Sequence, residues 1–125
     1  MIKIAVSSGD PAGIGPDICI KAFGQKKIYD FSPVVFGDKE LFKSRANTLG
    51  IDVDIQTYKG QKELPNDSLW IANIDCDLNI LPGKPDPNCA NFIISNFKQA
   101  VERTISEEFE AVVTCPINKE IINNG

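Results

Sequence analysis

Short apolar runs alternate with stretches of helical spacing along the chain. Strands are predicted at residues 2–7, 33–36, 53–58, 69–72 and 111–114. Helices are predicted where apolar positions recur every three or four residues, at 16–23, 39–49 and roughly 87–107. Strands that alternate with helices are typical of an α/β fold, so we expect a largely parallel sheet flanked by helices.

The predicted helices begin and end at residues suited to those positions. Pro16 stands at the start of the first helix, where a missing N–H is tolerated. Asp38 is expected to cap the amino end of the helix at 39–49, and Gly50 is expected to end that helix. Asp86 is expected to cap the long helix that follows it, and Asn118 a last helix from residue 119 onward.

The long helix at 87–107 has the clearest apolar periodicity. The residues of this pattern recur every three or four positions and give the helix one apolar face: Ala90, Ile93, Ile94, Phe97, Ala100, Val101, Thr104 and Ile105. The charged side chains of Lys98, Glu102 and Arg103 lie outside it.

The composition is that of one soluble globular domain. A chain of 125 residues buries about 65% of its unfolded surface, which is enough for a core. The longest apolar runs are too short to span a bilayer. The first residues read as a strand and lack the regions of a signal peptide. A net charge of −4 disfavours non-specific binding to nucleic acid, which needs a cationic surface.

The chain has no histidine and four cysteines. Without imidazole, the chain by itself excludes Ser-His-Asp and Cys-His catalysis and any zinc site that uses histidine. Cys19, Cys76, Cys89 and Cys115 show no C-x-x-C spacing, and a four-thiolate metal site would need such close pairs. We therefore expect buried free thiols in a reducing cytoplasm.

The first segment with candidate chemistry runs from Ser7 to Asp17, between a strand and a helix. α/β proteins place ligand loops at this position, and Gly13 and Gly15 permit close backbone approaches. The spacing is neither G-x-G-x-x-G nor a P-loop, and Asp10 and Asp17 count against simple anion binding. A ligand loop and a plain tight turn both remain open.

The second candidate segment, residues 114–119, follows the last predicted strand. Thr114 offers a hydroxyl and Lys119 a cation near a helix start, which suits a phosphate or carboxylate contact. The same residues also fit a structural role, with Thr114 hydrogen-bonded at the strand end and Lys119 in solvent.

The two segments together resemble one family. Gly9-Asp10-Pro11-Ala12-Gly13-Ile14-Gly15-Pro16 is similar to a signature of the 4-hydroxythreonine-4-phosphate dehydrogenase family, and Thr114-x-Pro116-Ile117-Asn118-Lys119 to that family's next block. The order and separation of the blocks also match. The intervening residues fit only in their strand–helix alternation. The resemblance implies part of a two-domain fold like that of isocitrate and isopropylmalate dehydrogenases.

The resemblance implies an oxidoreductase of pyridoxal 5'-phosphate biosynthesis. Such enzymes oxidise 4-phosphooxy-L-threonine with NAD or NADP, and the product then loses carbon dioxide. A divalent metal ion (Zn, Mg or Co), held by histidines, assists both steps. The resemblance also implies a homodimer that acts on a small phosphorylated hydroxy acid. From the charge, the short apolar runs and the free thiols, we expect a cytoplasmic protein that binds neither nucleic acid nor a membrane.

The chain departs from that family in its length. The family's metal-binding histidines and most of its cofactor contacts come after the second block, so no catalytic, cofactor-binding or metal-ligating residue is assigned here. We expect residues 1–125 to be the N-terminal α/β portion of a longer dehydrogenase, inactive alone and without its C-terminal remainder. Gly13, Gly15, Thr114 and Lys119 are the candidate substrate or anion cleft.

Two alternatives remain open. In the first, the full protein acts on a related four-carbon acid, 4-phospho-D-erythronate or 4-phospho-threonate. The residues that would distinguish these substrates in the family are absent from this chain. In the other alternative the chain is a non-catalytic α/β binding module.

Overall fold

The computed structural model describes residues 2–24, 30–76, 80–84 and 86–116 of the chain. Its elements follow in the order β1 (Lys3–Ser7), α1 (Gly15–Phe23), β2 (Ser32–Gly37), α2 (Lys39–Leu49), β3 (Ile55–Thr57), β4 (Leu69–Asn73), the short 3-10 helix η1 (Pro87–Cys89), α3 (Ala90–Ile105) and β5 (Ala111–Thr114). The last helix predicted from residue 119 lies outside the described residues.

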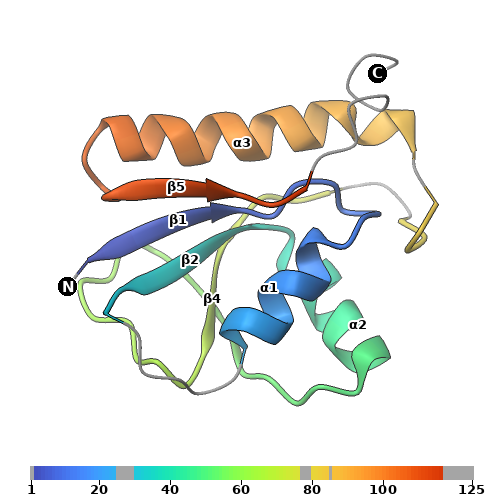
Figure 1. Ribbon diagram of the computed structural model, residues 1–125, viewed down its shortest axis with the longest axis horizontal. Coiled ribbons are helices and arrows are strands. Elements are labelled where there is room, and N and C mark those ends of the chain that lie inside the picture. Colours follow the sequence, from blue (N-terminus) through green and yellow to red (C-terminus); the bar gives the residue numbers. More distant parts are fainter. Residues whose placement is uncertain (1, 25–29, 77–79, 85, 117–125) are drawn as a thin grey trace.

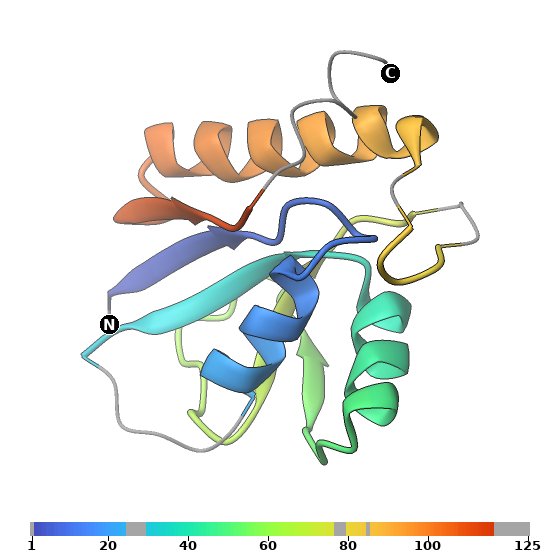
Figure 2. The same ribbon diagram turned by 45° about the vertical axis from the view of Figure 1, so that its right-hand side comes forward.

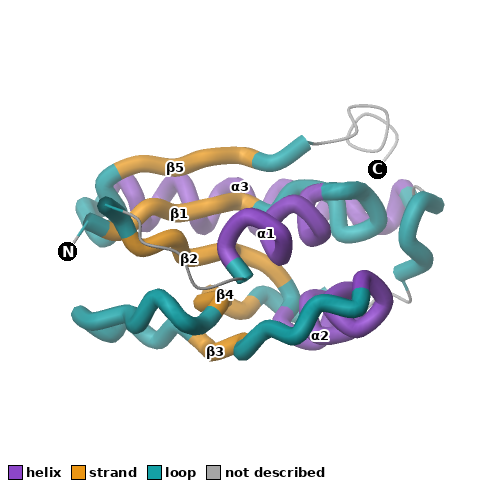
Figure 3. Tube along the Cα trace, turned by 60° about the horizontal axis from the view of Figure 1, so that its bottom comes forward, coloured by secondary structure: helices purple, strands orange, loops and turns teal. Residues whose placement is uncertain are grey.

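The strands form a parallel sheet with the order β3-β4-β2-β1-β5. Helix α3 covers one face of this sheet, and α1 and α2 cover the other (Figure 1). Figure 3 shows the same layers from another side, with α3 behind the strands. The predicted fold class, a parallel sheet flanked by helices, is confirmed.

Alternation along the strands divides the core into two layers. Val6 and Val35 face α1 and α2, together with Ile20 and Phe42 from those helices. The preceding strand residues point the other way, so that Ala5 and Val34 face α3 and pack with Ala100. Because side chains of a strand alternate between faces, a sheet covered on both sides needs the continuous apolar runs that the sequence contains.

The predicted helix ends are mostly confirmed. The Asp38 side chain accepts hydrogen bonds from the backbone N–H groups of Glu40 and Leu41 at the start of α2. Gly50 ends α2 with a φ of 69°, in the left-handed region that favours glycine. Asp86 accepts from the N–H of Asn88, but it caps η1 rather than the α-helix itself.

The predicted apolar face of α3 is only partly correct. The residues that pack inward include Ile93, Asn96 and Ala100, whereas Ile94 and Phe97 are 48% and 42% exposed. A helix that lies on one flat sheet buries a narrow stripe, and this helix has more apolar residues than that stripe holds. The polar residue Asn96 occupies the centre of the stripe because its amide satisfies groups at the strand ends, described below.

None of the helices in the described ranges has both the length and the apolar character that crossing a bilayer requires.

A charged cluster fixes the turn between α3 and β5. Arg103 donates to both carboxylate oxygens of Glu108, with the Nε–Oε1 distance at 2.7 Å. Its guanidinium also lies over the rings of Phe36, Tyr58 and Phe109, 5.3 to 5.6 Å from their centroids. The Tyr58 hydroxyl donates to Glu108 at 2.8 Å. Hydrogen bonds from Arg103 hold the pKa of Glu108 below its usual value. Burial is the main cause that raises the pKa of Tyr58 to about 12, and the hydrogen bond to Glu108 adds to it.

Stability should therefore depend on pH through Glu108. Its pKa is lower in the folded chain than in the unfolded chain, where it is about 4.3. Its contribution is therefore complete above that value and is lost as pH falls through the folded pKa. We expect Glu108→Gln to reduce the free energy of unfolding at pH 7 by up to about 1 kcal/mol, since both partners are partly exposed. Urea unfolding between about pH 3 and 7 should show this difference vanish toward acid.

Glu107→Gln is the matched control, since it removes the neighbouring carboxylate, which is in none of the described ion pairs. A difference between Glu108→Gln and the parent chain that stays constant down to pH 3 would contradict the assignment.

Candidate functional site

The carboxyl ends of β1 and β5 mark the place where the chain changes direction across the sheet. The chain leaves β1 through α1 on one face and reaches β5 through α3 on the opposite face, as Figure 2 shows. β1 and β5 are neighbours, and Ser7 pairs with Thr114 at their ends. In open α/β sheets, ligands bind in the crevice outside such a switch point. Both candidate segments of the sequence therefore start at the carboxyl ends of the strands, where a ligand is expected.

Two glycines allow the loop after β1 to lie against the loop after β5. Gly9 has a φ of +75°, and a Cβ there would lie 2.5 Å from the Pro116 carbonyl oxygen. A Cβ at Gly15 would lie 1.9 Å from the carbonyl oxygen of Ser8 and 3.1 Å from the Cβ of Cys115. Only glycine fits at these two positions, because any side chain would push the two loops apart.

Gly13 differs from Gly15. Its φ lies outside the left-handed region, and a Cβ would meet only Asp10, at an ordinary contact distance of 3.4 Å. A side chain is therefore excluded by close neighbours at Gly15 but not at Gly13. Gly9, which the sequence reasoning quoted but did not single out, has the second close approach.

The Asp10 carboxylate organises the loop from within. It is 5% exposed, and its Oδ1 accepts from the backbone N–H of Ala12 at 2.9 Å. The Asp10 carbonyl oxygen accepts from the N–H of Gly13 at 3.0 Å. These bonds form a local turn, so Asp10 has a structural role in the loop.

Arg45 holds the same loop from helix α2. Its side chain is 3% exposed, and its guanidinium donates to the carbonyl oxygens of Gly13 and Pro11. It also donates to the Asp17 carboxylate at 3.0 Å, a pair that links α2 to the first turn of α1. Since both terminal nitrogens of Arg45 donate to protein oxygens, this side chain fixes the loop, whereas its buried Nε has no hydrogen-bond partner among the described residues.

Asn96 holds the strand ends from the opposite face. Its side chain is fully buried; Oδ1 accepts from the Ser7 hydroxyl at 2.9 Å, and Nδ2 donates to the Ser8 hydroxyl oxygen and the Phe36 carbonyl. A buried amide with these partners ties α3 to the ends of β1 and β2.

The structure places three of the four predicted site residues at the carboxyl ends of β1 and β5. Gly13 and Gly15 lie in the loop after β1, and Thr114 is exposed at the end of β5. Lys119 lies outside the described residues. Sequence reasoning missed the roles of Arg45 and Asn96, although each is a polar residue within an otherwise apolar helical stripe, and this is the signal that would have found them.

The residues present do not fit the metal that the resemblance implies. The chain contains no histidine, and the described residues contain no group of three His, Cys, Asp or Glu side chains that would hold an ion. The loop after β1 does not fit a pyrophosphate either, because the Asp10 and Asp17 carboxylates stand beside the start of α1.

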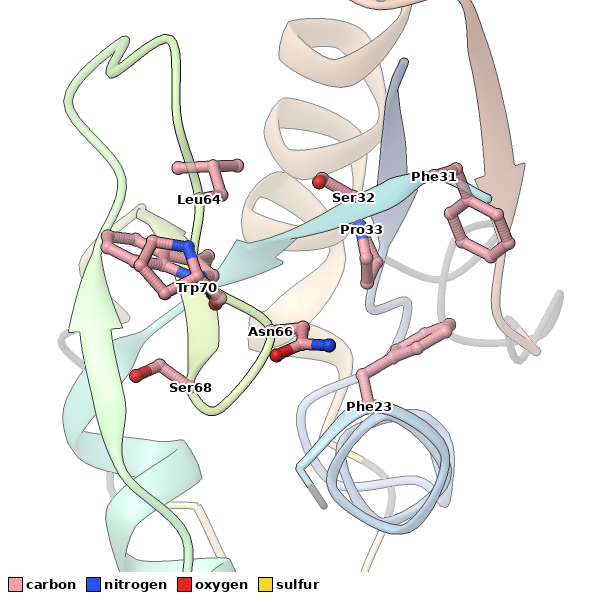
Figure 4. A pocket seen from close by; sticks show the side chains of 9 residues that line it. Phe23, Phe31, Ser32, Pro33, Leu64, Asn66, Ser68 and Trp70 are labelled. Carbon is pink, nitrogen blue, oxygen red and sulfur yellow. Dashed lines mark hydrogen bonds between the residues drawn. The ribbon is translucent and has the colours of Figure 1, made fainter. Parts of the chain in front are cut away.

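A separate shallow hollow lies at the opposite, amino ends of the strands. Its lining is mostly apolar and includes Phe23, Phe31, Pro33 and Trp70 (Figure 4). It opens at the amino ends of β2 and β4, where α/β sheets rarely bind ligands, and Trp70 Nε1 already donates to the Pro65 carbonyl oxygen. We therefore place the candidate site at the loops and not at this hollow.

Residues 30–125 match the family model described as pyridoxal phosphate biosynthetic protein PdxA. A 4-hydroxythreonine-4-phosphate dehydrogenase of Pseudoalteromonas atlantica is 34% identical over 99% of this chain and 38% of its own length. The chain thus spans well under half the length of that relative.

Solved structures share the fold. A 4-hydroxythreonine-4-phosphate dehydrogenase from Klebsiella pneumoniae aligns with a TM-score of 0.89 and 20% identity, over 98% of this chain and 39% of that one. A terephthalate 1,2-cis-dihydrodiol dehydrogenase from Burkholderia xenovorans aligns with a TM-score of 0.78 and 21% identity, over 99% and 37%.

Gly15 and Gly13 give a matched pair of substitutions. Gly15→Ala should destabilise the chain by about 3 kcal/mol or more, because the new Cβ overlaps the Ser8 carbonyl and backbone must move. Gly13→Ala should change the stability by less than about 1 kcal/mol. Chemical unfolding followed by circular dichroism would measure both, and equal losses would contradict the geometry of the loop.

Proposed function

The chain belongs to the family of pyridoxal phosphate biosynthetic protein PdxA, and we propose that it forms the N-terminal α/β portion of a 4-hydroxythreonine-4-phosphate dehydrogenase. The observation that carries this proposal is the family match over residues 30–125. The name of the relative from Pseudoalteromonas atlantica supports the activity, and its greater length supports a two-domain protein of which residues 1–125 are one part.

The proposed reaction is the oxidation of 4-phosphooxy-L-threonine with NAD or NADP as the hydride acceptor, followed by decarboxylation. We propose that it depends on a divalent metal ion, whose ligands are not among these residues because the chain has no histidine. The contribution of this chain is therefore positional. The loop after β1 and the end of β5 form a wall of the substrate cleft, where the Thr114 hydroxyl and the Lys119 ammonium contact the substrate's phosphate or carboxylate.

The substrate rests on the relatives' names and not on the fold. A dehydrogenase of a terephthalate dihydrodiol shares this fold, so the same scaffold accommodates a different substrate. Dehydrogenases of 4-phospho-D-erythronate or 4-phospho-threonate therefore remain the alternative within the enzyme class, and a non-catalytic binding module remains the alternative outside it.

We also propose that the full protein is a cytoplasmic homodimer. The four cysteines are free thiols in the structure, and two of them are buried, which suits a reducing compartment. The homodimer is carried over from the family resemblance alone.

An assay of NAD and NADP reduction by the full-length protein tests the proposal. We expect turnover of 4-phosphooxy-L-threonine in the presence of a divalent cation and a large loss of turnover after chelation. The four-carbon alternatives, 4-phospho-D-erythronate and 4-phospho-threonate, are measured beside it. Faster turnover of either acid would move the assignment to that substrate, and no turnover of any acid would favour the binding module.

The cleft residues can be tested separately in the same assay. Thr114→Val and Lys119→Gln should each raise the KM for the phosphorylated acid about tenfold, because each removes one charge-assisted contact. Thr48→Val and Lys98→Gln, at exposed positions on α2 and α3, are the matched controls and should leave KM unchanged. An unchanged KM in Thr114→Val and Lys119→Gln would remove both residues from the cleft while leaving the activity itself intact.

A further inference from the structure

Two thiols from opposite ends of the chain are in contact beside the candidate site. The Sγ atoms of Cys19, in α1, and Cys115, directly after β5, are 3.6 Å apart, although 96 positions separate them in the sequence. Cys19 is fully buried, whereas Cys115 is partly exposed. An oxidant in solvent can therefore reach one thiol of the pair, and the other lies behind it.

The two thiols differ in their chemical character. The two thiols share a hydrogen bond in which either sulfur can be the donor. This hydrogen bond lowers the pKa of Cys115, while the same hydrogen bond, followed by burial, raises the pKa of Cys19. The thiolate is the nucleophilic form of cysteine. Cys115 is accordingly the thiol that reacts first, and Cys19 is the one placed to react with its product.

The backbone on both sides of the pair is already fixed. The N–H of Cys115 donates to the Ser7 carbonyl oxygen at 2.9 Å, and the start of α1 at Gly15 packs against the Cβ of Cys115. A disulfide has an S–S length of about 2.05 Å, so the sulfurs must approach by about 1.5 Å.

We propose that Cys115 and Cys19 form a modification site at which a hydroperoxide oxidises the pair to an intramolecular disulfide. Cys115 first releases its proton. The thiolate then attacks one oxygen of hydrogen peroxide, the O–O bond breaks, and the leaving hydroxide takes up the released proton to form water. The Cys19 sulfur then attacks the Cys115 sulfenic acid. The S–S bond forms as the S–O bond breaks, and the hydroxyl leaves with the Cys19 proton as a second water.

The disulfide would join the two segments that form the candidate site. Cys115 follows Thr114 directly, and Cys19 lies one helical turn beyond Gly15. The covalent link would join the end of β5 directly to α1. A reversible disulfide of this kind in a reducing compartment is typical of redox sensing.

The other two cysteines provide internal controls. Cys89 is fully buried, and burial raises its pKa to about 12, so its thiol is inert. Cys76 is partly exposed, like Cys115. Exposure alone would make Cys76 as reactive as Cys115, whereas the paired geometry makes only Cys115 form a disulfide with Cys19.

The test is a peptide map of the full-length protein after treatment with hydrogen peroxide. Trypsin places Cys19 in the peptide Ile4–Lys21 and Cys115 in Thr104–Lys119, each with a single cysteine. We expect mass spectrometry under non-reducing conditions to find these two peptides joined, with the loss of two hydrogens, as the main oxidised product. Dithiothreitol should separate them again.

Single substitutions identify the roles of the two thiols. In Cys19→Ala the joined peptides should be lost completely, and Cys115 should accumulate as sulfinic acid. In Cys115→Ala the Cys19 thiol should stay reduced. The matched control Cys76→Ser should still form the linked pair. Failure of the unsubstituted protein to link the two peptides, or equal linkage of Cys76, would overturn the proposal, and this result does not depend on whether any variant folds.

Discussion

The contact between the backbone of Gly15 and the carbonyl of Ser8 is the constraint on which the rest of the structure depends. A Cβ at Gly15 would lie 1.9 Å from that oxygen, so α1 starts directly against the end of β1. This start directs Cys19 and Ile20 into the core between α1 and the sheet. It also leaves room for the loop after β5 to lie beside the loop after β1. The close packing of the two loops at the switch point thus depends on a residue that has no side chain.

Two buried polar side chains maintain that arrangement from opposite faces. Arg45 reaches the loop from the α2 side and neutralises Asp17, while Asn96 reaches the strand ends from the α3 side. Removing one partner of a buried ion pair costs about 3–5 kcal/mol, and each buried polar group left unpaired costs about 1–3 kcal/mol. These contacts hold the loop after β1 to α2 and the strand ends to α3.

The sequence predicted the elements of the fold well and the packing of the site poorly. The alternation of strands and helices and the cap at Asp38 follow from local patterns that need no tertiary contact. The inward orientation of Asn96 does not follow from a local pattern. Helix α3 has more apolar residues than one sheet face can cover, so the apolar pattern alone does not show which residues face inward. Gly9 and Gly13 likewise look equivalent in sequence. The left-handed φ of Gly9 and its contact with the Pro116 carbonyl, more than a hundred residues later, distinguish them.

The two motif blocks that carry the family resemblance are the two segments that touch at the switch point. Gly9 lies against the Pro116 carbonyl, and Gly15 against the Cβ of Cys115, so each block limits what the other can contain. A pair of motifs linked by such contacts identifies a fold more specifically than either motif does alone. The same contacts explain why they do not identify a substrate. They join the glycine backbone to the Pro116 carbonyl oxygen and the Cys115 Cβ, and such packing contacts carry no information about a ligand.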